Sequence, residues 1–392
     1  MTELRRVLGV RGAAIVGLGA MLGTGVFAAW TPAVDLAGSA LLIALAGAAI
    51  VAALNAVSTG SLARSLPQSG GAYAYGRAYL HRSAGVVAGY AFVVGKAASA
   101  GAAALTIGAY SWPGYERLIG LVAVALALGL DLRGIVKSVR VTAVLVAIVL
   151  MVLGILAVVV VGTSGDLRIV GGGVGAPASS VSVLAAAGIL FVAFAGYARI
   201  TVLGEEVRDP VRTIPRAMVM SFAVVIVVYA VLAFAVLLAV NAGVTLSDAP
   251  LESMAKALDS PALVTAVRIG AVIAAGGALL SLIAGIGRTL FAMGRGGDAP
   301  RALSVVGERT RVPSRAAITA AVLTAMVVVV GGIAFALALS AASILTYYAI
   351  AHLAVLARVR TGDARRGLGL TSGLGLIGCG ALVAGLVVTA LA

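Results

Sequence analysis

One lysine stands in the middle of a long uncharged stretch and could do chemistry there. Lys96 lies in the run YAFVVGKAASAGAAAL, and no other charged residue occurs between Ser83 and Tyr115. If this stretch crosses a membrane, such a residue is expected to face the bundle interior and to mark a substrate, ion or proton path. A low dielectric disfavours the charged form of lysine, which makes Lys96 a candidate proton carrier. A static lysine bonded to backbone carbonyls is the alternative.

Two glycine-containing stretches could bind a ligand through the backbone. They read GLGAMLGTGVF, from Gly17 to Phe27, and GILFVAFAGYA, from Gly188 to Ala198. If a membrane helix unwinds there, its free N–H and C=O groups need partners. The N-terminus of a half-helix attracts an anion, and exposed carbonyls attract an ammonium group or a small cation. A zwitterionic amino acid would satisfy both. The alternative is that the glycines only let helices pack closely.

The composition decides which solvent surrounds these residues. The chain has 392 residues, of which 62% are hydrophobic and 11% are charged, whereas a soluble domain is about 25% charged. We therefore expect an integral membrane protein with one transmembrane domain covering residues 1–392.

The net charge of +14 is spread over many short loops, which argues against a nucleic-acid-binding module. One cysteine and two histidines leave little for a metal site.

Apolar stretches of about 20 residues predict membrane helices. Eleven are found, and the fourth is short. The ninth and tenth are joined by almost no loop, so one long kinked helix competes with that interpretation. The predicted spans are about 10–31, 37–62, 83–110, 117–132, 140–162, 182–203, 216–241, 262–292, 316–334, 336–357 and 368–391.

The distribution of basic residues tests the count. With the N-terminus in the cytoplasm and alternating loops, the inner segments hold 22 lysines and arginines and the outer segments hold 4. This is the asymmetry that the positive-inside rule demands. Merging the ninth and tenth spans would move the segment RVRTGDARR to the outside, so the eleven-span count is preferred.

The two interrupted spans are the first and the sixth, which are corresponding positions in two halves. The first repeat covers about 10–162, the second about 182–357, and an extra helix about 368–391. Five spans per half invert the second copy relative to the first. Paired interruptions at matching places are the best sequence indication of a transporter binding site.

Several stretches give the chain a family resemblance. GLGAMLGTGVF resembles the first-helix glycine pattern of the amino acid–polyamine–organocation (APC) superfamily. LPQSGGAYAYGRAYL resembles the loop after its second helix, and FVAFAGYARITVLGEEVRDPVRTIPRAM resembles its sixth helix and the following loop. GRTLFAMGRGGDAP is a weaker match after the eighth helix. The resemblance covers about residues 10–320 and implies an all-α, LeuT-like five-plus-five inverted repeat.

The resemblance also implies where substrate would bind. The backbone at Gly23, Thr24 and Gly25 would take the substrate carboxylate, and carbonyls around the sixth-helix break would take its amino group. Many relatives carry an aromatic residue where this chain has Val192. The residues that would supply those carbonyls or close over the substrate are Phe191, Val192, Ala193, Phe194, Ala195 and Tyr197.

Proton-coupled relatives carry a lysine in the fifth helix, where this chain has Val149. We therefore hypothesise that Lys96 supplies, from the third helix, the positive charge that relatives obtain from sodium or from that lysine. A cation site is a further possibility, with carbonyls of Gly19 and Leu22 and the hydroxyl of Ser281. A serine that bonds its own helix is the more common arrangement.

An inner gate is predicted at the cytoplasmic end of the sixth span. Arg199 lies three residues past Gly196, and Glu205 and Glu206 follow one to two turns later. These residues would form a salt bridge that closes the inner side. Alternatively, the arginine lines solvent or reaches phosphate head groups, and the glutamates cap a helix end and pair with Arg208.

The sequence thus predicts a secondary amino acid transporter in the plasma membrane of a prokaryote, with small or apolar neutral substrates and no cofactor. The partners are an amino acid, the lipid bilayer and, through Lys96, a proton. The alternatives are a polyamine or amine carrier and an exchanger without ion coupling. A membrane-embedded enzyme or a channel is disfavoured, because neither histidine lies in a mid-membrane cluster.

Overall fold

The computed structural model describes residues 8–66, 70–134, 139–163, 175, 179–201, 207–306 and 312–391. The regular secondary structure of this part of the chain is helical, with one isolated bridge between Leu8 and Val207. The helices are α1 (Val10–Met21), α2 (Thr24–Ala28), α3 (Trp30–Ala37), η1 (Gly38–Ala40), α4 (Leu41–Ser65), α5 (Ala72–Tyr79), α6 (Arg82–Ser111), α7 (Glu116–Leu132), α8 (Val139–Thr163), α9 (Ser180–Phe194), η2 (Ala195–Tyr197), α10 (Ala198–Thr201), α11 (Pro210–Asn241), α12 (Pro250–Ala257), α13 (Pro261–Arg295), η3 (Arg301–Ser304), α14 (Ser314–Val330), α15 (Ile333–Arg360) and α16 (Arg366–Leu391).

The helices account for the predicted membrane spans. In the described residues, 9 segments are long and apolar enough to cross a membrane. Two further helices, α7 and α14, have 17 residues each and lie where the fourth and ninth spans were predicted. The second candidate span runs from Trp30 to Ser65 and is divided, because α3 ends at Gly38, whose φ is +52°, and η1 then leads into α4.

The ninth and tenth spans are separate helices. Between α14 and α15, Gly331 and Gly332 have extended backbone conformations, with ψ of 172° and −175°. A one-helix interpretation of residues 316–357 is therefore wrong. Two short helices lie in loops outside the predicted spans, α5 before α6 and α12 before α13.

Both predicted interruptions are present. The first span is divided into α1 and α2 by Leu22 and Gly23, and Gly23 leaves the helical region with φ −85° and ψ −134°. The sixth span changes from α9 to the tighter helix η2 and then to α10. The two interrupted segments pack on each other, α1 against η2 and α2 against α9.

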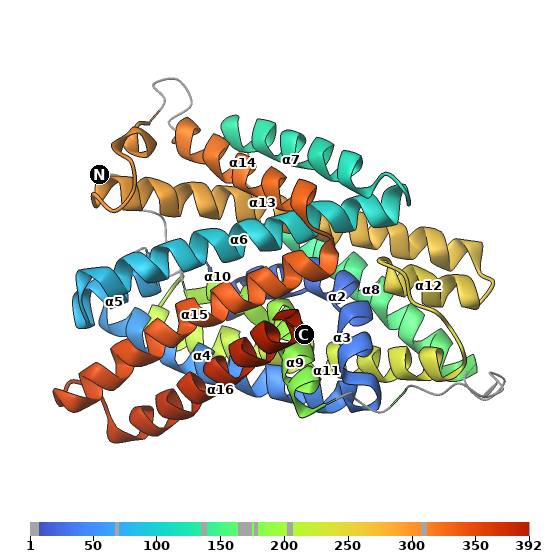
Figure 1. The fold of residues 1–392 in the computed structure, drawn as a ribbon, viewed down its shortest axis with the longest axis horizontal. Helices are drawn as coiled ribbons and strands as arrows, with labels where there is room; N and C mark the ends of the chain where they lie inside the picture. Colours follow the sequence, from blue (N-terminus) through green and yellow to red (C-terminus); the bar gives the residue numbers. More distant parts are fainter. Residues whose placement is uncertain are drawn as a thin grey trace.

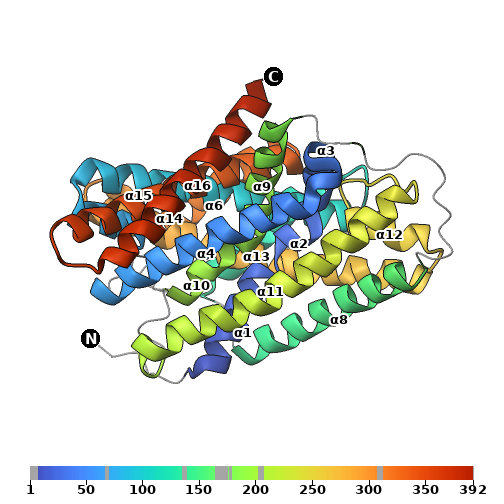
Figure 2. The ribbon, with the colours of Figure 1, turned by 90° about the horizontal axis from the view of Figure 1, so that it is seen from below.

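Two groups of helices surround this pair. In Figure 1, α6 runs across the molecule with α7, α13 and α14 on one side and α15 on the other, in agreement with the packing of α6. Figure 2 shows α8 and α11 beside α1, while α4 and α16 lie with α9. The interrupted helices are therefore held between layers of uninterrupted ones.

Candidate functional site

The first interruption brings backbone very close to the sixth span. A Cβ atom built on Gly25 would lie 2.5 Å from the Cα of Ala193, so only glycine permits this approach. A Cβ on Gly23 would lie 3.1 Å from the Cβ of Ala278 on α13. The glycines of the predicted carboxylate site thus have a packing role in this conformation, as their alternative interpretation proposed.

Thr24 is the polar residue between these glycines. It is the first residue of α2 and is buried, with 8% of its surface exposed. Its Oγ1 has no hydrogen-bond partner among the described residues. A buried hydroxyl without a partner is costly, and this one lies where the half-helix α2 presents its N–H groups.

The second interruption contacts the end of α1. A Cβ on Gly196 would lie 2.4 Å from the backbone carbonyl of Ala20 and 2.5 Å from the nitrogen of Met21. The two breaks are therefore in direct backbone contact at two points, one on each side of the pair. Such contact requires glycine in both helices, at Gly25 and at Gly196.

A tyrosine hydroxyl joins carbonyls of both breaks. Tyr229 lies on α11 and is buried, and its hydroxyl is 2.6 Å from the carbonyl oxygen of Met21 and 3.2 Å from that of Ala193. One hydroxyl has one proton to donate, so the two carbonyls share it. Sequence reasoning missed Tyr229, although a hydroxyl inside the apolar run VVIVVYAVLAF was a detectable signal.

Aromatic side chains surround the sixth-helix break. Phe194 packs edge-on against Tyr229, and its ring is also parallel to that of Phe222. Phe191 and Tyr197 both contact Tyr348 on α15, at centroid distances of 6.0 and 5.5 Å. The hydroxyl of Tyr197 is buried without a hydrogen-bond partner among the described residues.

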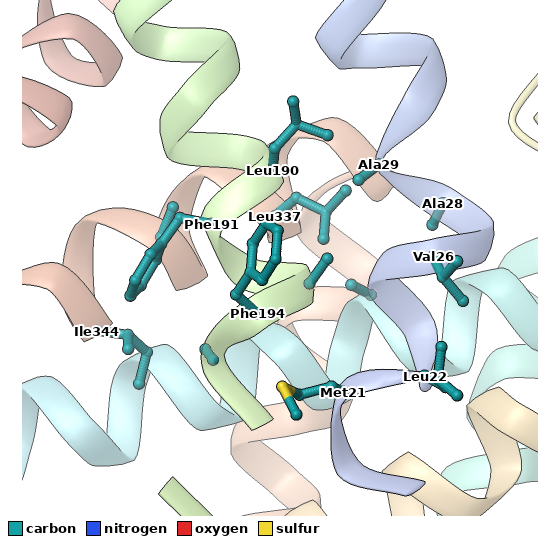
Figure 3. Close-up of a cluster of buried hydrophobic side chains, with 14 of the residues drawn as sticks. Met21, Leu22, Val26, Ala28, Ala29, Leu190, Phe191, Phe194, Leu337 and Ile344 are labelled. Atoms are coloured by element: carbon teal, nitrogen blue, oxygen red, sulfur yellow. The ribbon is translucent and has the colours of Figure 1, made fainter. Parts of the chain in front are cut away.

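Apolar side chains fill the space between the interrupted helices (Figure 3). Met21 and Phe194 lie between the two segments, whereas Phe191 points away from α2 toward Ile344. Ala193 and Ala195 are buried, and Val192 is half-buried. The predicted substrate-binding residues therefore lie together where α2 meets α9. Apolar side chains fill the space between these helices in this conformation.

The predicted cation site is not assembled here. Ser281 donates its hydroxyl hydrogen to the carbonyl of Gly277, one turn earlier on its own helix, at 3.0 Å. A Cβ on Gly19 would lie 2.7 Å from Thr142 on α8, and Leu22 is buried. The structure thus shows the serine bonded to its own helix.

The predicted inner gate is only partly described. Arg199 lies on α10 and is half-buried. Glu205 and Glu206 lie outside the described residues. The gate therefore stays a prediction.

Lys96 occupies the middle of α6 and is half-buried. Its Nζ lies 5.9 Å from the centroid of the Phe92 ring, a cation–π distance. No salt bridge to Lys96 occurs within the described part of the chain. The alternative interpretation placed its ammonium group on backbone carbonyls. The contact observed for this group in the described residues is the one with the Phe92 ring.

The end of α2 opposite its break is fixed by a second tyrosine that sequence reasoning missed. The Tyr110 hydroxyl on α6 donates to the carbonyl of Phe27 at 2.8 Å and accepts from the N–H of Leu251 on α12 at 3.3 Å. Thr31 also donates to the carbonyl of Ser247, at 2.6 Å. Tyr110 thereby links α2 to α12, and Thr31 joins the following helix α3 to the loop before α12.

Comparison with known proteins finds transporters among the sequence relatives of this chain. The sequence pattern of the family described as amino acid permease matches residues 8–392. An uncharacterized transporter of Mycobacterium tuberculosis is 43% identical over 379 residues, covering 96% of this chain and 85% of the relative. The branched-chain amino acid permease BcaP of Bacillus subtilis is 26% identical over 343 residues, covering 79% of this chain and 72% of the relative.

A solved structure matches the fold. A sodium-coupled sialic acid symporter in a substrate-bound outward-open state aligns with a TM-score of 0.62 over 98% of this chain and 90% of that chain. The sequence identity is 11%, so the match speaks for the fold alone. It confirms the predicted all-α, LeuT-like class for this multi-pass membrane protein.

The shared hydroxyl of Tyr229 leads to a prediction. Tyr229→Phe leaves the carbonyls of Met21 and Ala193 without this donor, which should cost about 1–3 kcal/mol, because an unpartnered buried acceptor keeps its desolvation penalty. We expect a melting temperature several degrees lower than that of the wild type in detergent, measured by thermal unfolding. Tyr115→Phe removes an exposed hydroxyl and is the matched control. Equal melting temperatures for the two variants would contradict the bridging role.

Proposed function

The chain belongs to the amino acid permease family, and we propose that it is a secondary transporter moving small or apolar neutral amino acids across the plasma membrane by alternating access. The observation that carries the proposal is the direct meeting of two interrupted membrane helices. No charged residue occurs between Met21 and Phe27 or between Leu190 and Ala198. A ligand held there must be bound by backbone groups, hydroxyls and apolar side chains.

A zwitterionic amino acid fits these groups. Its carboxylate is suited to the N-terminus of α2, where backbone N–H groups and the Thr24 hydroxyl lack helical partners. Its ammonium group is suited to the carbonyls at the end of α9, including that of Ala193. A polyamine lacks the carboxylate and needs acidic partners, which neither break supplies.

The surrounding side chains favour small or apolar substrates. Val192, Ala193, Phe194 and Ala195 offer no charge and no hydrogen-bonding side chain to a substrate R group. The Bacillus subtilis relative is named as a permease for branched-chain amino acids, which are apolar. Both points support the substrate class.

The transport proposal is tested by exchange. Purified protein in liposomes, loaded with one unlabelled amino acid at a time, should accumulate the labelled amino acid by counterflow. A thermal-shift panel of amino acids and putrescine should show stabilisation by small or apolar neutral amino acids. Stabilisation by putrescine alone would favour an amine carrier. Stabilisation without trans-stimulated exchange would exclude a carrier of that ligand.

Substitution of Thr24 distinguishes a role of its hydroxyl in substrate binding from a role in packing. Thr24→Val keeps the shape of the side chain and removes an atom that has no partner, so stability without substrate should be unchanged or slightly higher. Substrate binding should weaken by about tenfold, which corresponds to one hydrogen bond of about 1.4 kcal/mol. The measurement is isothermal titration with the amino acid found in the panel.

Thr24→Ser keeps the hydroxyl and serves as the matched variant, which should bind nearly as tightly as the wild type. If Thr24→Val binds as tightly as Thr24→Ser, the carboxylate does not meet this hydroxyl. If both variants unfold early, Thr24 is a packing residue.

We further propose that uptake is coupled to protons through Lys96. The residue lies mid-helix in α6 without an acidic partner in the described chain, so its charge is stabilised mainly by Phe92. A lysine without an acidic partner inside a membrane span is costly, and such residues mark ion or proton paths. We also propose an inner gate, in which Arg199 forms a salt bridge with Glu205 or Glu206.

Lys96→Met should retain substrate binding and counterflow while losing uphill uptake driven by a pH gradient. The measurement compares accumulation in liposomes with acidic and neutral outer buffer. Lys137→Met removes another lysine and is the charge-matched control. Unchanged, pH-dependent accumulation by Lys96→Met would show that another group carries the proton.

A further inference from the structure

The last two helices form a hairpin with an apolar hollow on its membrane side. α15 and α16 run antiparallel and lie side by side at the edge of the bundle (Figures 1 and 2). Between them is a hollow of about 360 Å³ whose lining includes Ala349, Cys379, Gly380 and Ala384. A Cβ at Gly380 would meet no atom within 4 Å, so the hollow is open at this point.

One face of each helix leads from this hollow to an arginine. On α15, Thr346, Leu353 and Arg360 are seven residues apart, and on α16 so are Arg366, Gly373 and Gly380. Residues seven apart lie on one helical face to within about 20°. All six positions are half-buried or exposed, so both faces are accessible from outside the protein.

The two arginines stand at the ends of the membrane spans. The candidate spans end at Arg360 and begin at Arg366. Both side chains are exposed, and neither forms a salt bridge with any described residue. The nearby carboxylate of Asp363 accepts a hydrogen bond from Thr361. Two guanidinium groups are therefore available to an anion at the level of the lipid head groups.

We propose that this seam binds one anionic phospholipid, with the phosphate between Arg360 and Arg366 and one acyl chain along the seam into the hollow. Along α15, Ala349 is 11 residues from Arg360, or about 16 Å at 1.5 Å per residue. One leaflet of hydrocarbon is about 15 Å thick, half of a 30 Å core. An acyl chain anchored at the arginines thus ends at the hollow.

The site adjoins polar groups that connect the hairpin to the core. Cys379, in the hollow's wall, lies 3.3 Å from Oδ1 of Asn55 on α4, and the same oxygen lies 2.7 Å from Nε2 of His352 on α15. A Cβ at Gly375 would lie 2.2 Å from the His352 ring, so the imidazole is tightly enclosed. A lipid in the seam would cover this cluster and stabilise the packing of α15 on α4 and α16.

This inference depends only on the membrane-embedded fold and is independent of which solute is transported. The experiment is native mass spectrometry of the full-length protein in detergent, equilibrated with equal amounts of phosphatidylglycerol and phosphatidylcholine that carry the same acyl chains. The wild type is expected to retain one phosphatidylglycerol with at least fivefold preference. Arg360→Gln combined with Arg366→Gln should abolish the preference.

Two matched controls locate the site. Arg301→Gln combined with Arg315→Gln removes the same charge from exposed positions elsewhere and should keep the preference. Gly380→Leu fills the hollow and should reduce retention of the lipid at least threefold, whereas Gly129→Leu, at another open glycine, should not. Millimolar inorganic phosphate should not displace the lipid, because it lacks the acyl chain.

The proposal is overturned if the wild type retains both lipids equally, or if both arginine pairs reduce the preference to the same extent, which would indicate diffuse attraction. It is also overturned if Gly380→Leu retains lipid like the wild type, or if inorganic phosphate competes, which would indicate an anion site without a seated chain. Thermal unfolding of each variant without added lipid establishes that any loss of binding is not a loss of folding.

Discussion

The structure depends on one constraint, which is that a helix interrupted inside a bilayer must find partners for its freed backbone groups. Hydrocarbon offers none, and each unsatisfied group costs several kcal/mol. Here the two interruptions satisfy part of the requirement by meeting each other. Glycine at positions 25 and 196 brings the chains to backbone contact, and Tyr229 supplies a donor to carbonyls of both segments. A single interruption in an otherwise intact bundle would lack these partners.

The neighbouring helices follow from that requirement. α11 must carry Tyr229 to the breaks, and α6 must carry Tyr110 to the far end of α2. α15 contributes Tyr348, which packs against Phe191 and Tyr197 and supports the sixth helix from outside. α16 follows α15 at the end of the chain, and its Gly375 packs against the ring of His352 on α15. The packing of the uninterrupted helices thereby supports the interrupted ones.

Much of this architecture could be predicted because hydropathy and glycine placement act locally. The spans, the two breaks and the separation of the ninth and tenth helices at Gly331 and Gly332 all follow from short stretches. The contacts of the site could not be predicted in the same way. Tyr229 is 208 residues from Met21, and Tyr110 is 141 residues from Leu251. For Ser281, the sequence allowed two interpretations, and the local bond to its own helix is the one observed.

The close contact between the breaks also bears on how the helices would have to move if a ligand bound between them. With Gly25 against the backbone of Ala193, α2 and α9 have no space between them at that level. If a substrate carboxylate binds at the start of α2, as proposed above, these segments must separate. Separation lengthens one of the two contacts of Tyr229, and its single proton then belongs to one carbonyl alone. The other carbonyl loses its donor and becomes available to an ammonium group. In the proposed binding mode, the movement that admits the carboxylate of a zwitterion would thus free an acceptor for its ammonium group. Binding would then be coupled to a change of helix position without any charged side chain at the breaks.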